Sequence, residues 1–204
     1  MAKTAKPGKT ARVPLDLGDR RRFELLEAAY TIIGERGLEG LRTRDIAARA
    51  GVNISTLHYY FGTKEALVVA VVGHASEKFT TPPPGRRPEP VTASLRAHLD
   101  ASWRTFQSTP HLATVLQELV LRGQRDAATR AAFRALHDQW NRIVEDVLRR
   151  DVERGALRAD LDPAQGARIV TSFIMGASVQ LGVNARAFDF GEVARRLESW
   201  LAPR

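Results

Sequence analysis

Apolar residues recur at every third or fourth position through almost every long segment of the chain, which is typical of amphipathic α-helices. We find no segment with the convincing alternation of a half-buried strand. The pattern therefore predicts an all-α protein of about nine helices. We expect these helices at residues 19–36, 43–50, 53–61, 63–79, 91–108, 110–123, 126–154, 163–183 and 189–201.

The first four expected helices should form one packed unit, because the second and third are too short to be stable alone. Thr43 is placed to cap the second helix, Asn53 or Ser55 to cap the third, and Thr63 to cap the fourth. The first helix presents one apolar stripe to these neighbours. The stripe consists of Phe23, Leu26, Ala29, Tyr30 and Ile33.

Proline-rich residues 80–90 separate this unit from the longer helices that follow. We therefore predict a flexible basic arm over residues 1–18, a small helical head over 19–64, and a larger helical domain over 65–204. In the larger domain, Asp162 followed by Pro163 is a strong start signal for a helix. The helices at 163–183 and 189–201 carry more apolar residues than one side of a monomer can bury, which favours pairing of two copies through them.

Charge changes the picture in the first third of the chain. The formal net charge is +8, and residues 1–64 hold 12 basic and 7 acidic side chains, a net +5. This distribution points to a polyanion, nucleic acid or an anionic membrane surface, with a merely solvated basic surface as the alternative. Cysteine is absent, so we expect no disulfide, no thiolate chemistry and no Cys-ligated metal. We also expect no cofactor. We find no signal peptide and no apolar run of membrane-spanning length, and we expect a cytoplasmic protein.

The two short helices on either side of Gly51 have the layout of a helix-turn-helix, whose second helix lies in the major groove of DNA. Val52, Leu57 and Phe61 should fix that second helix to the core. Its exposed side chains should then be Ser55, Thr56, His58, Tyr59 and Tyr60.

Residues 19–68 resemble the DNA-binding domain of the TetR family of bacterial transcriptional repressors. The resemblance rests on the long first helix, "TRDIAARAGV" in the second, "TLHYYFGTKEAL" in the third, and the start of the fourth. One difference is His58, where the family often has Tyr directly after the "TL" pair. The resemblance implies a double-stranded DNA partner, a homodimer whose helices 163–183 and 189–201 form a four-helix bundle, and a helical domain that senses a small molecule.

By position, the resemblance also implies roles for single residues. Thr43 and Lys64 would bind phosphates, Arg44 would enter the groove from the second helix, and Tyr60 would donate to the DNA backbone. The residues that would face the bases are Asn53, Ile54, Ser55, Thr56, His58 and Tyr59.

The small-molecule effector would sit among the middle helices, where apolar and aromatic side chains dominate the inner stripes. The candidate ligand-binding residues are Trp103, Phe106, Gln107, Leu116, Leu119, Trp140, Phe173 and Met175. Further possible polar contacts are His111, Gln117, His137 and Asn141. Ordinary core packing is the alternative for each of them.

Two other functions remain open. A DNA-binding dimer without an effector would be regulated by a protein partner or by its own concentration. A helical enzyme is the rival class, but the five histidines form no HxxxH pair, and we find no phosphate-binding glycine loop and no GxSxG. We therefore expect no catalytic residues.

Overall fold

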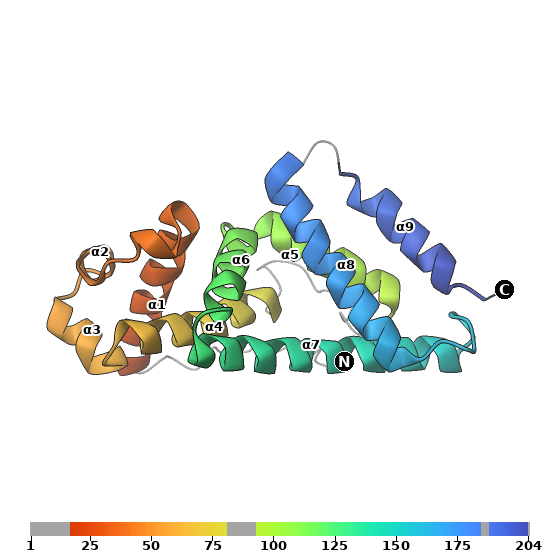
Figure 1. The fold of residues 1–204 in the computed structure, drawn as a ribbon, viewed down its shortest axis with the longest axis horizontal. Coiled ribbons are helices and arrows are strands. Elements are labelled where there is room, and N and C mark those ends of the chain that lie inside the picture. Colours follow the sequence, from red (N-terminus) through yellow and green to blue (C-terminus); the bar gives the residue numbers. More distant parts are fainter. Residues whose placement is uncertain (1–16, 81–92, 185–187, 204) are drawn as a thin grey trace, which may run out of the picture.

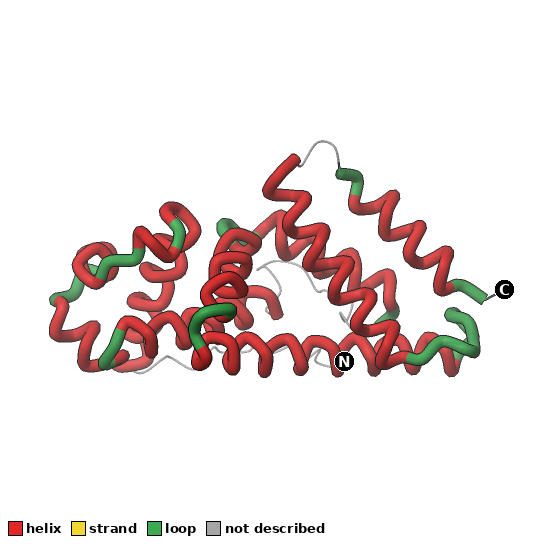
Figure 2. The backbone as a smooth tube through the Cα atoms, viewed as in Figure 1, coloured by secondary structure: helices red, strands yellow, loops and turns green. Residues whose placement is uncertain are grey.

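The computed structural model describes residues 17–80, 93–184 and 188–203, and within them every regular element is helical (Figure 1, Figure 2). The expected all-α class is confirmed, and each expected helix is present with its ends shifted by at most four residues. The elements are α1 (Leu17–Arg36), the 3-10 helix η1 (Leu38–Gly40), α2 (Thr43–Arg49), α3 (Ile54–Phe61), α4 (Lys64–Thr80), α5 (Leu95–Ser108), α6 (Leu112–Gly123), α7 (Ala127–Glu153), α8 (Pro163–Asn184) and α9 (Phe190–Leu201).

The molecule is elongated, with α1, α2 and α3 at one end and α8 and α9 toward the other (Figure 1). We call α1 to α3, together with the start of α4 at Lys64, the head. Helix α4 leaves the head and packs against α6 and α7, while α7 runs along the larger domain and packs on α8. One buried apolar cluster is continuous from the head into the larger domain. The head is therefore joined to the rest through packed helices.

Side-chain caps fix most helix starts, including the predicted caps Asn53, Thr63 and Asp162. Each cap accepts a hydrogen bond from a backbone N–H of the first turn, which satisfies a donor that has no partner within the helix. The caps are Asn53 for α3, Thr63 for α4, Ser94 for α5, Asp126 for α7, Asp162 for α8 and Asp189 for α9.

Two expectations about the head are wrong. Thr43 does not cap α2, because it is already the first helical residue; Arg42 holds the extended cap conformation and makes no side-chain cap bond. Phe23 is not in the core and is 46% exposed. It lies near the start of α1, where its ring contacts His74 edge-on at 5.3 Å between centroids. The buried face of α1 begins two residues later, at Leu25.

Most of the predicted basic arm and of the proline-rich joint lies outside the described residues. Helix α1 begins at Leu17, two residues inside the segment expected to be an arm. The three-part domain division therefore stays a prediction.

Candidate nucleic-acid interface and interior cavity

Helix α3 is held in place by its cap and by two buried side chains. Asn53 accepts hydrogen bonds at its Oδ1 from the backbone N–H of Thr56 (2.8 Å) and from the Thr56 hydroxyl (2.9 Å). Of the two caps that the sequence allows, Asn53 is thus the one used. Leu57 is 1% exposed and Phe61 is 7% exposed, so they fix one face of α3 to the core. The opposite face is left to solvent.

The predicted DNA-binding residues lie on the surface of the head. Tyr59 is the most exposed of them, at 84%, and its ring meets that of Tyr60 edge-on at 5.2 Å. His58 forms a hydrogen bond through Nδ1 with the carbonyl of Gly62 at 3.2 Å. Thr43, Thr56 and Tyr60 are half-buried, and the exposed members are Arg44, Asn53, Ile54, Ser55, His58, Tyr59 and Lys64.

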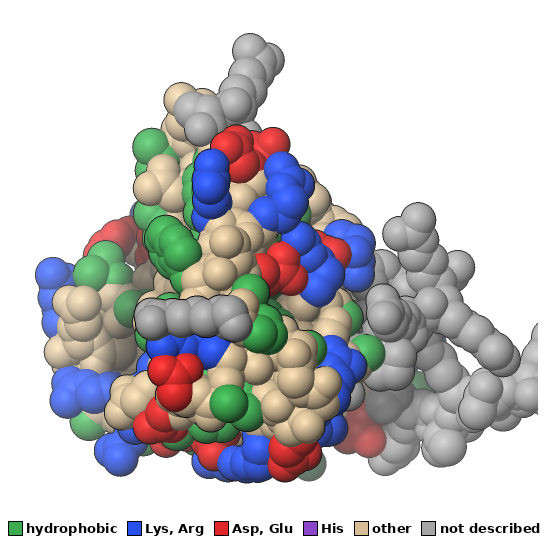
Figure 3. Space-filling view, turned by 90° about the vertical axis from the view of Figure 1, so that its right-hand side faces the viewer, with side chains coloured by type: hydrophobic (Ala, Val, Ile, Leu, Met, Phe, Trp, Pro, Cys, Tyr) green, Lys and Arg blue, Asp and Glu red, His purple; other side chains and the backbone are tan. Residues whose placement is uncertain are grey.

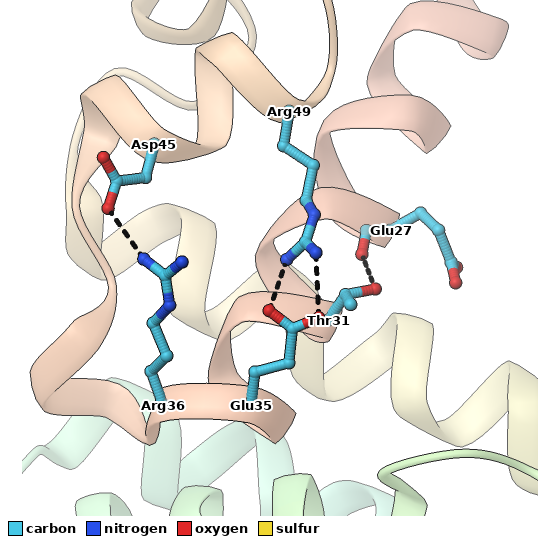
Figure 4. Close-up of polar contacts among 6 residues, drawn as sticks. All are labelled: Glu27, Thr31, Glu35, Arg36, Asp45 and Arg49. Carbon is cyan, nitrogen blue, oxygen red and sulfur yellow. Dashed lines mark hydrogen bonds and ion pairs between the residues drawn. The ribbon is translucent and has the colours of Figure 1, made fainter.

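Two ion pairs fix α2 against α1 (Figure 4). Arg49 donates from both terminal nitrogens to the carboxylate of Glu35, each at 2.8 Å, and Arg36 lies 3.4 Å from Asp45. The hydrogen bonds from Arg49 lower the pKa of Glu35. All four side chains are partly exposed, so these pairs orient α2 more than they stabilise it.

The remaining cations of the head are free to meet phosphates. Among residues 17–80, the cations that form no ion pair with a described acidic side chain are Arg21, Arg22, Arg42, Arg44 and Lys64. Arg42 is not among the DNA-binding residues predicted from the sequence. The opposite end of the molecule differs, since Figure 3 shows acidic and basic side chains interspersed there. The head therefore presents a set of cations that have no ion-pair partner among the described residues.

A cavity of about 610 Å³ lies among α4, α5, α6, α7 and α8, and it opens to solvent where Leu121 and Val179 of its lining are exposed. Its size is in the usual range for small-molecule sites. Four of the eight predicted ligand-binding residues line it: Phe106, Leu116, Trp140 and Met175.

The other four predicted residues do not line the cavity. Trp103 stacks on Phe190 of α9, with centroids 4.4 Å apart and rings 3° from parallel, and Phe173 leans on the same ring at 5.5 Å. These rings fasten α9 to α5 and α8. Leu119 is fully buried in the core and Gln107 is exposed. Helical spacing marks an inward side chain, but it cannot say which inward position borders a void.

Polar side chains occupy part of the cavity wall. Trp140 donates from Nε1 to Nε2 of His98 at 3.0 Å, and the Asn141 amide lies 2.9 Å from Nδ1 of His137. Of the further polar candidates from the sequence, Gln117 and His137 line the cavity, whereas His111 and Asn141 do not. Other polar lining residues were not predicted from the sequence, because a single polar side chain forms no repeating pattern that would indicate its place in the fold. The missed ones are Ser76, His98, Ser102, Thr105, Gln124, Gln139 and Ser178.

Helices α4 and α6 connect the cavity to the head. Helix α4 begins at Lys64 in the head, and further along it Ser76 and Phe79 line the cavity. On α6, Glu118 accepts a hydrogen bond from the backbone N–H of Leu38 at 3.0 Å. The hydroxyl of Tyr30 in α1 donates to the carbonyl of Pro110, just before α6, at 2.8 Å. Two helices therefore run from the cavity walls to contacts with the head.

A second link ties α1 to α4. Glu27 accepts hydrogen bonds from His74 Nε2 at 2.8 Å and from Lys78 Nζ at 3.0 Å. The hydrogen bond from His74 is the main cause that lowers the pKa of Glu27 to about 2, and Lys78 adds to it against the opposing effect of burial.

Helices α8 and α9 expose a set of apolar side chains. Its members are Ile169, Val179, Val183, Val193 and Trp200, which are 54%, 44%, 77%, 38% and 72% exposed. Among the described residues, α8 is the one helix with the length and hydropathy to cross a membrane, although the sequence led us to expect none. It packs along α7, and a core helix passes the same test.

Within the described residues, no group of three His, Asp or Glu side chains is placed to hold a metal ion.

Two family profiles match the chain. Residues 25–71 match the bacterial regulatory proteins of the TetR family, and residues 91–203 match the C-terminal domain of BetI-type transcriptional repressors. The second match alone spans more than half of the chain.

Curated relatives carry related descriptions. The chain is 30% identical to the HTH-type transcriptional repressor KstR2 of Rhodococcus jostii (strain RHA1) over 150 residues, 70% of each chain. It is 26% identical to the HTH-type transcriptional repressor NicS of Pseudomonas putida over 148 residues, 70% of this chain and 68% of NicS. The match to the HTH-type transcriptional regulator PksA of Bacillus subtilis is 37% identical over 62 residues and spans only 30% of each chain.

Solved structures share the fold. A TetR transcription regulator from Haloarcula marismortui superposes with a TM-score of 0.71 at 24% identity, covering 89% of this chain and 95% of that one. A transcriptional regulator from Saccharomonospora viridis, solved in complex with choline, gives 0.68 at 21% identity with the same coverage. At these identities the likeness concerns the fold.

Proposed function

The chain belongs to the TetR family of bacterial regulatory proteins, and from this premise we propose that its homodimer represses transcription at a palindromic operator until a small, largely apolar ligand releases it. Membership makes it a DNA-binding transcriptional regulator with a BetI-type C-terminal domain. The family consists of regulators and not of enzymes, so the helical-enzyme alternative is set aside. A regulator of this kind acts where the DNA is, which supports the expected cytoplasmic location.

The exposed face of α3 carries the DNA part of the proposal. The residues from Asn53 to Tyr60 offer hydroxyls, an imidazole and aromatic edges to base pairs, and Thr43, Arg44 and Lys64 flank them for contacts with the groove and phosphates. The unpaired cations of the head supply the sequence-independent attraction.

Selection of duplexes from a random pool by the full-length chain tests this part. We expect an inverted repeat whose half-sites are about 34–36 Å apart, or a multiple of it. Affinity for the selected duplex should fall about 10³- to 10⁵-fold between about 50 and 200 mM salt, as for 6 to 10 neutralised phosphates. Enrichment of no sequence at all would contradict the proposal.

The exposed apolar side chains of α8 and α9 support a homodimer through residues 163–183 and 189–201. A second copy of the same face would cover Val183 and Trp200, which are otherwise among the most exposed large apolar side chains described. Sedimentation of Trp200→Glu against the unchanged protein tests this step. The substitution should shift the protein toward monomer and abolish tight operator binding, whereas an unchanged dimer would count against this surface.

The cavity supports control by a ligand. Ligand binding would move α4, which runs from the cavity to Lys64, so that the two heads no longer match the groove spacing. A coupling of about 1–3 kcal/mol, or five- to 150-fold in operator affinity, is typical of such switches. The choline of the S. viridis regulator is not carried over, because the similarity concerns the fold alone.

The alternative is a dimer without an effector, controlled by a protein partner or by concentration. A thermal-shift screen separates the two, since a ligand at about 100 times its Kd adds roughly 2.7 kcal/mol of stability. Compounds that stabilise the protein should then release it from the selected operator. If compounds occupy the cavity and operator affinity does not move, the effector part fails and the alternative stands.

A further inference from the structure

The cavity described above carries no charge. Its described lining includes no Asp, Glu, Lys or Arg from any of the five helices around it. An ion that enters this space gives up part of its hydration shell without gaining a partner of opposite charge, which is unfavourable. The lining therefore selects against anions and cations alike, unless the histidines or the aromatic rings supply compensation.

The partners of the two histidines determine which ring nitrogen of each accepts a hydrogen bond. Trp140 Nε1 can only donate, so His98 Nε2 must accept at 3.0 Å and the ring carries its proton on Nδ1. Asn141 accepts the Thr171 hydroxyl on Oδ1 at 2.9 Å and donates from Nδ2 to the backbone carbonyl of His137 at 3.1 Å. The same Nδ2 lies 2.9 Å from His137 Nδ1, which must therefore accept. A second proton on either ring would set donor against donor.

Three of the aromatic rings that line the cavity, Phe79, Phe106 and Trp140, pack on one another. Phe79 meets Trp140 edge-on at 5.1 Å and leans on Phe106 at 5.5 Å. Trp140 is also flanked by His98 at 6.4 Å and His137 at 6.3 Å between centroids. These ring contacts take up part of the space around Trp140 in which a quaternary ammonium group would need open ring faces within about 6 Å.

His137 offers the cavity a directed hydrogen-bond donor. Because its Nδ1 accepts from Asn141, the proton resides on Nε2, and no described residue accepts a hydrogen bond from that atom. The side chain lines the cavity and is half-buried. An acceptor atom on a ligand would satisfy this donor without bringing a charge into the site.

We infer that the ligand of this cavity is an uncharged molecule with an apolar body and a carbonyl or ether oxygen that accepts a hydrogen bond from His137 Nε2. This inference rests on the proposed effector function and gives the chemical class of the effector. In this inference, the cavity prefers neutral over charged ligands because its lining has no charged side chains. The hydrogen bond from His137 orients the ligand.

Calorimetric titration of the full-length protein without DNA tests the inference with three probes of the same chain length. These are methyl octyl ketone, decanoate and decyltrimethylammonium, all kept below micelle formation. We expect the ketone to bind and both ions to bind at least about tenfold more weakly. Equal binding of either ion, or no binding of the ketone up to its solubility limit, overturns the inference.

A pair of variants tests the role of His137. His137→Phe keeps a ring of similar size and removes the donor, and should weaken the ketone about two- to tenfold, the usual range for one hydrogen bond. Gln107→Ala, on α5 but outside the cavity lining, should leave ketone binding unchanged. Equal affinity of His137→Phe and the unchanged protein overturns the role of His137, and the comparison of the three probes does not depend on how either variant folds.

Release from the selected operator is measured separately, so the two proposals can fail independently. A ketone that binds with the expected preference and does not release DNA contradicts the proposed switch and leaves the ligand class intact. Release by the cationic probe at the lowest concentration of the three supports the switch and overturns the ligand class.

Discussion

The junction between α1 and α6 gives a prediction whose size follows from the coordinates. A Cβ atom added to Gly34 would lie 2.2 Å from Cβ and 2.3 Å from Cγ of His111, far inside van der Waals contact. His111 cannot easily retreat. It holds a positive φ of 63°, and it lies between Pro110, whose carbonyl is bonded to Tyr30, and the fully buried Leu112. Gly34→Ala should therefore force the head and α6 apart.

Gly73→Ala is the matched control, because Gly73 lies within α4 and its added Cβ would meet nothing within 4 Å. Alanine in place of glycine gains up to about 1 kcal/mol of helix propensity in either helix. Overpacking costs about 1–3 kcal/mol, and only Gly34→Ala incurs it. The difference between the two variants therefore isolates the clash, and we expect Gly34→Ala to be about 1–3 kcal/mol less stable than Gly73→Ala.

Urea unfolding followed by circular dichroism, at one protein concentration, measures this difference. A double variant with His111→Gly should recover most of the loss, because glycine removes the clashing ring and accepts the positive φ at that position. If Gly34→Ala is as stable as Gly73→Ala, the close approach of α1 and α6 is not as described. The coupling of the cavity to the head through α6 would then lose its basis.

Three further predictions concern the head. Lys64→Ala should weaken binding to all DNA sequences alike and reduce the salt slope by about 1, whereas Arg44→Ala should relax the sequence preference, both measured by fluorescence anisotropy. Glu27→Gln should lower the free energy of unfolding by about 1 kcal/mol near neutral pH, a value reduced by solvent screening because the Glu27 side chain is 40% exposed. The pKa of Glu27 falls from 4.5 to about 2 on folding, so this advantage of the unchanged protein should be full above pH 4.5 and vanish as the pH falls toward 2 in urea titrations. An advantage that is the same at both ends of that range would contradict the assignment. Asn53→Ala removes the cap of α3 and should cost about 1 kcal/mol in the same unfolding assay, and no loss would mean that the cap is unimportant.

Local chemistry made the helices and their starts predictable. Asn53, Thr63 and Asp162 act as caps because their side chains reach the N–H groups of the following turn, an effect that depends only on neighbouring residues. The prediction that Thr43 caps α2 was wrong for an equally local reason. The helix begins at Thr43 itself, one residue earlier than a cap at that position requires.

The cavity was only half predictable, because its lining depends on how five helices meet. Phe106 and Trp140 border the void, while Trp103 and Phe173 sit on equally apolar stripes and pack against α9. Nothing in the spacing of these rings distinguishes the two outcomes. The sequence did not indicate that His98 lines the cavity either, because its hydrogen-bond partner Trp140 is 42 residues away.

The central claim is that the exposed face of α3 reads DNA, and Tyr59→Ala tests it most directly. Tyr59 is 84% exposed, so its removal should leave the fold intact, as circular dichroism can verify. The measurement is the affinity for the selected operator divided by the affinity for random duplex, at fixed salt. We predict that this ratio falls about five- to 150-fold, the range for one lost base contact. An unchanged ratio in a folded Tyr59→Ala protein would contradict the account.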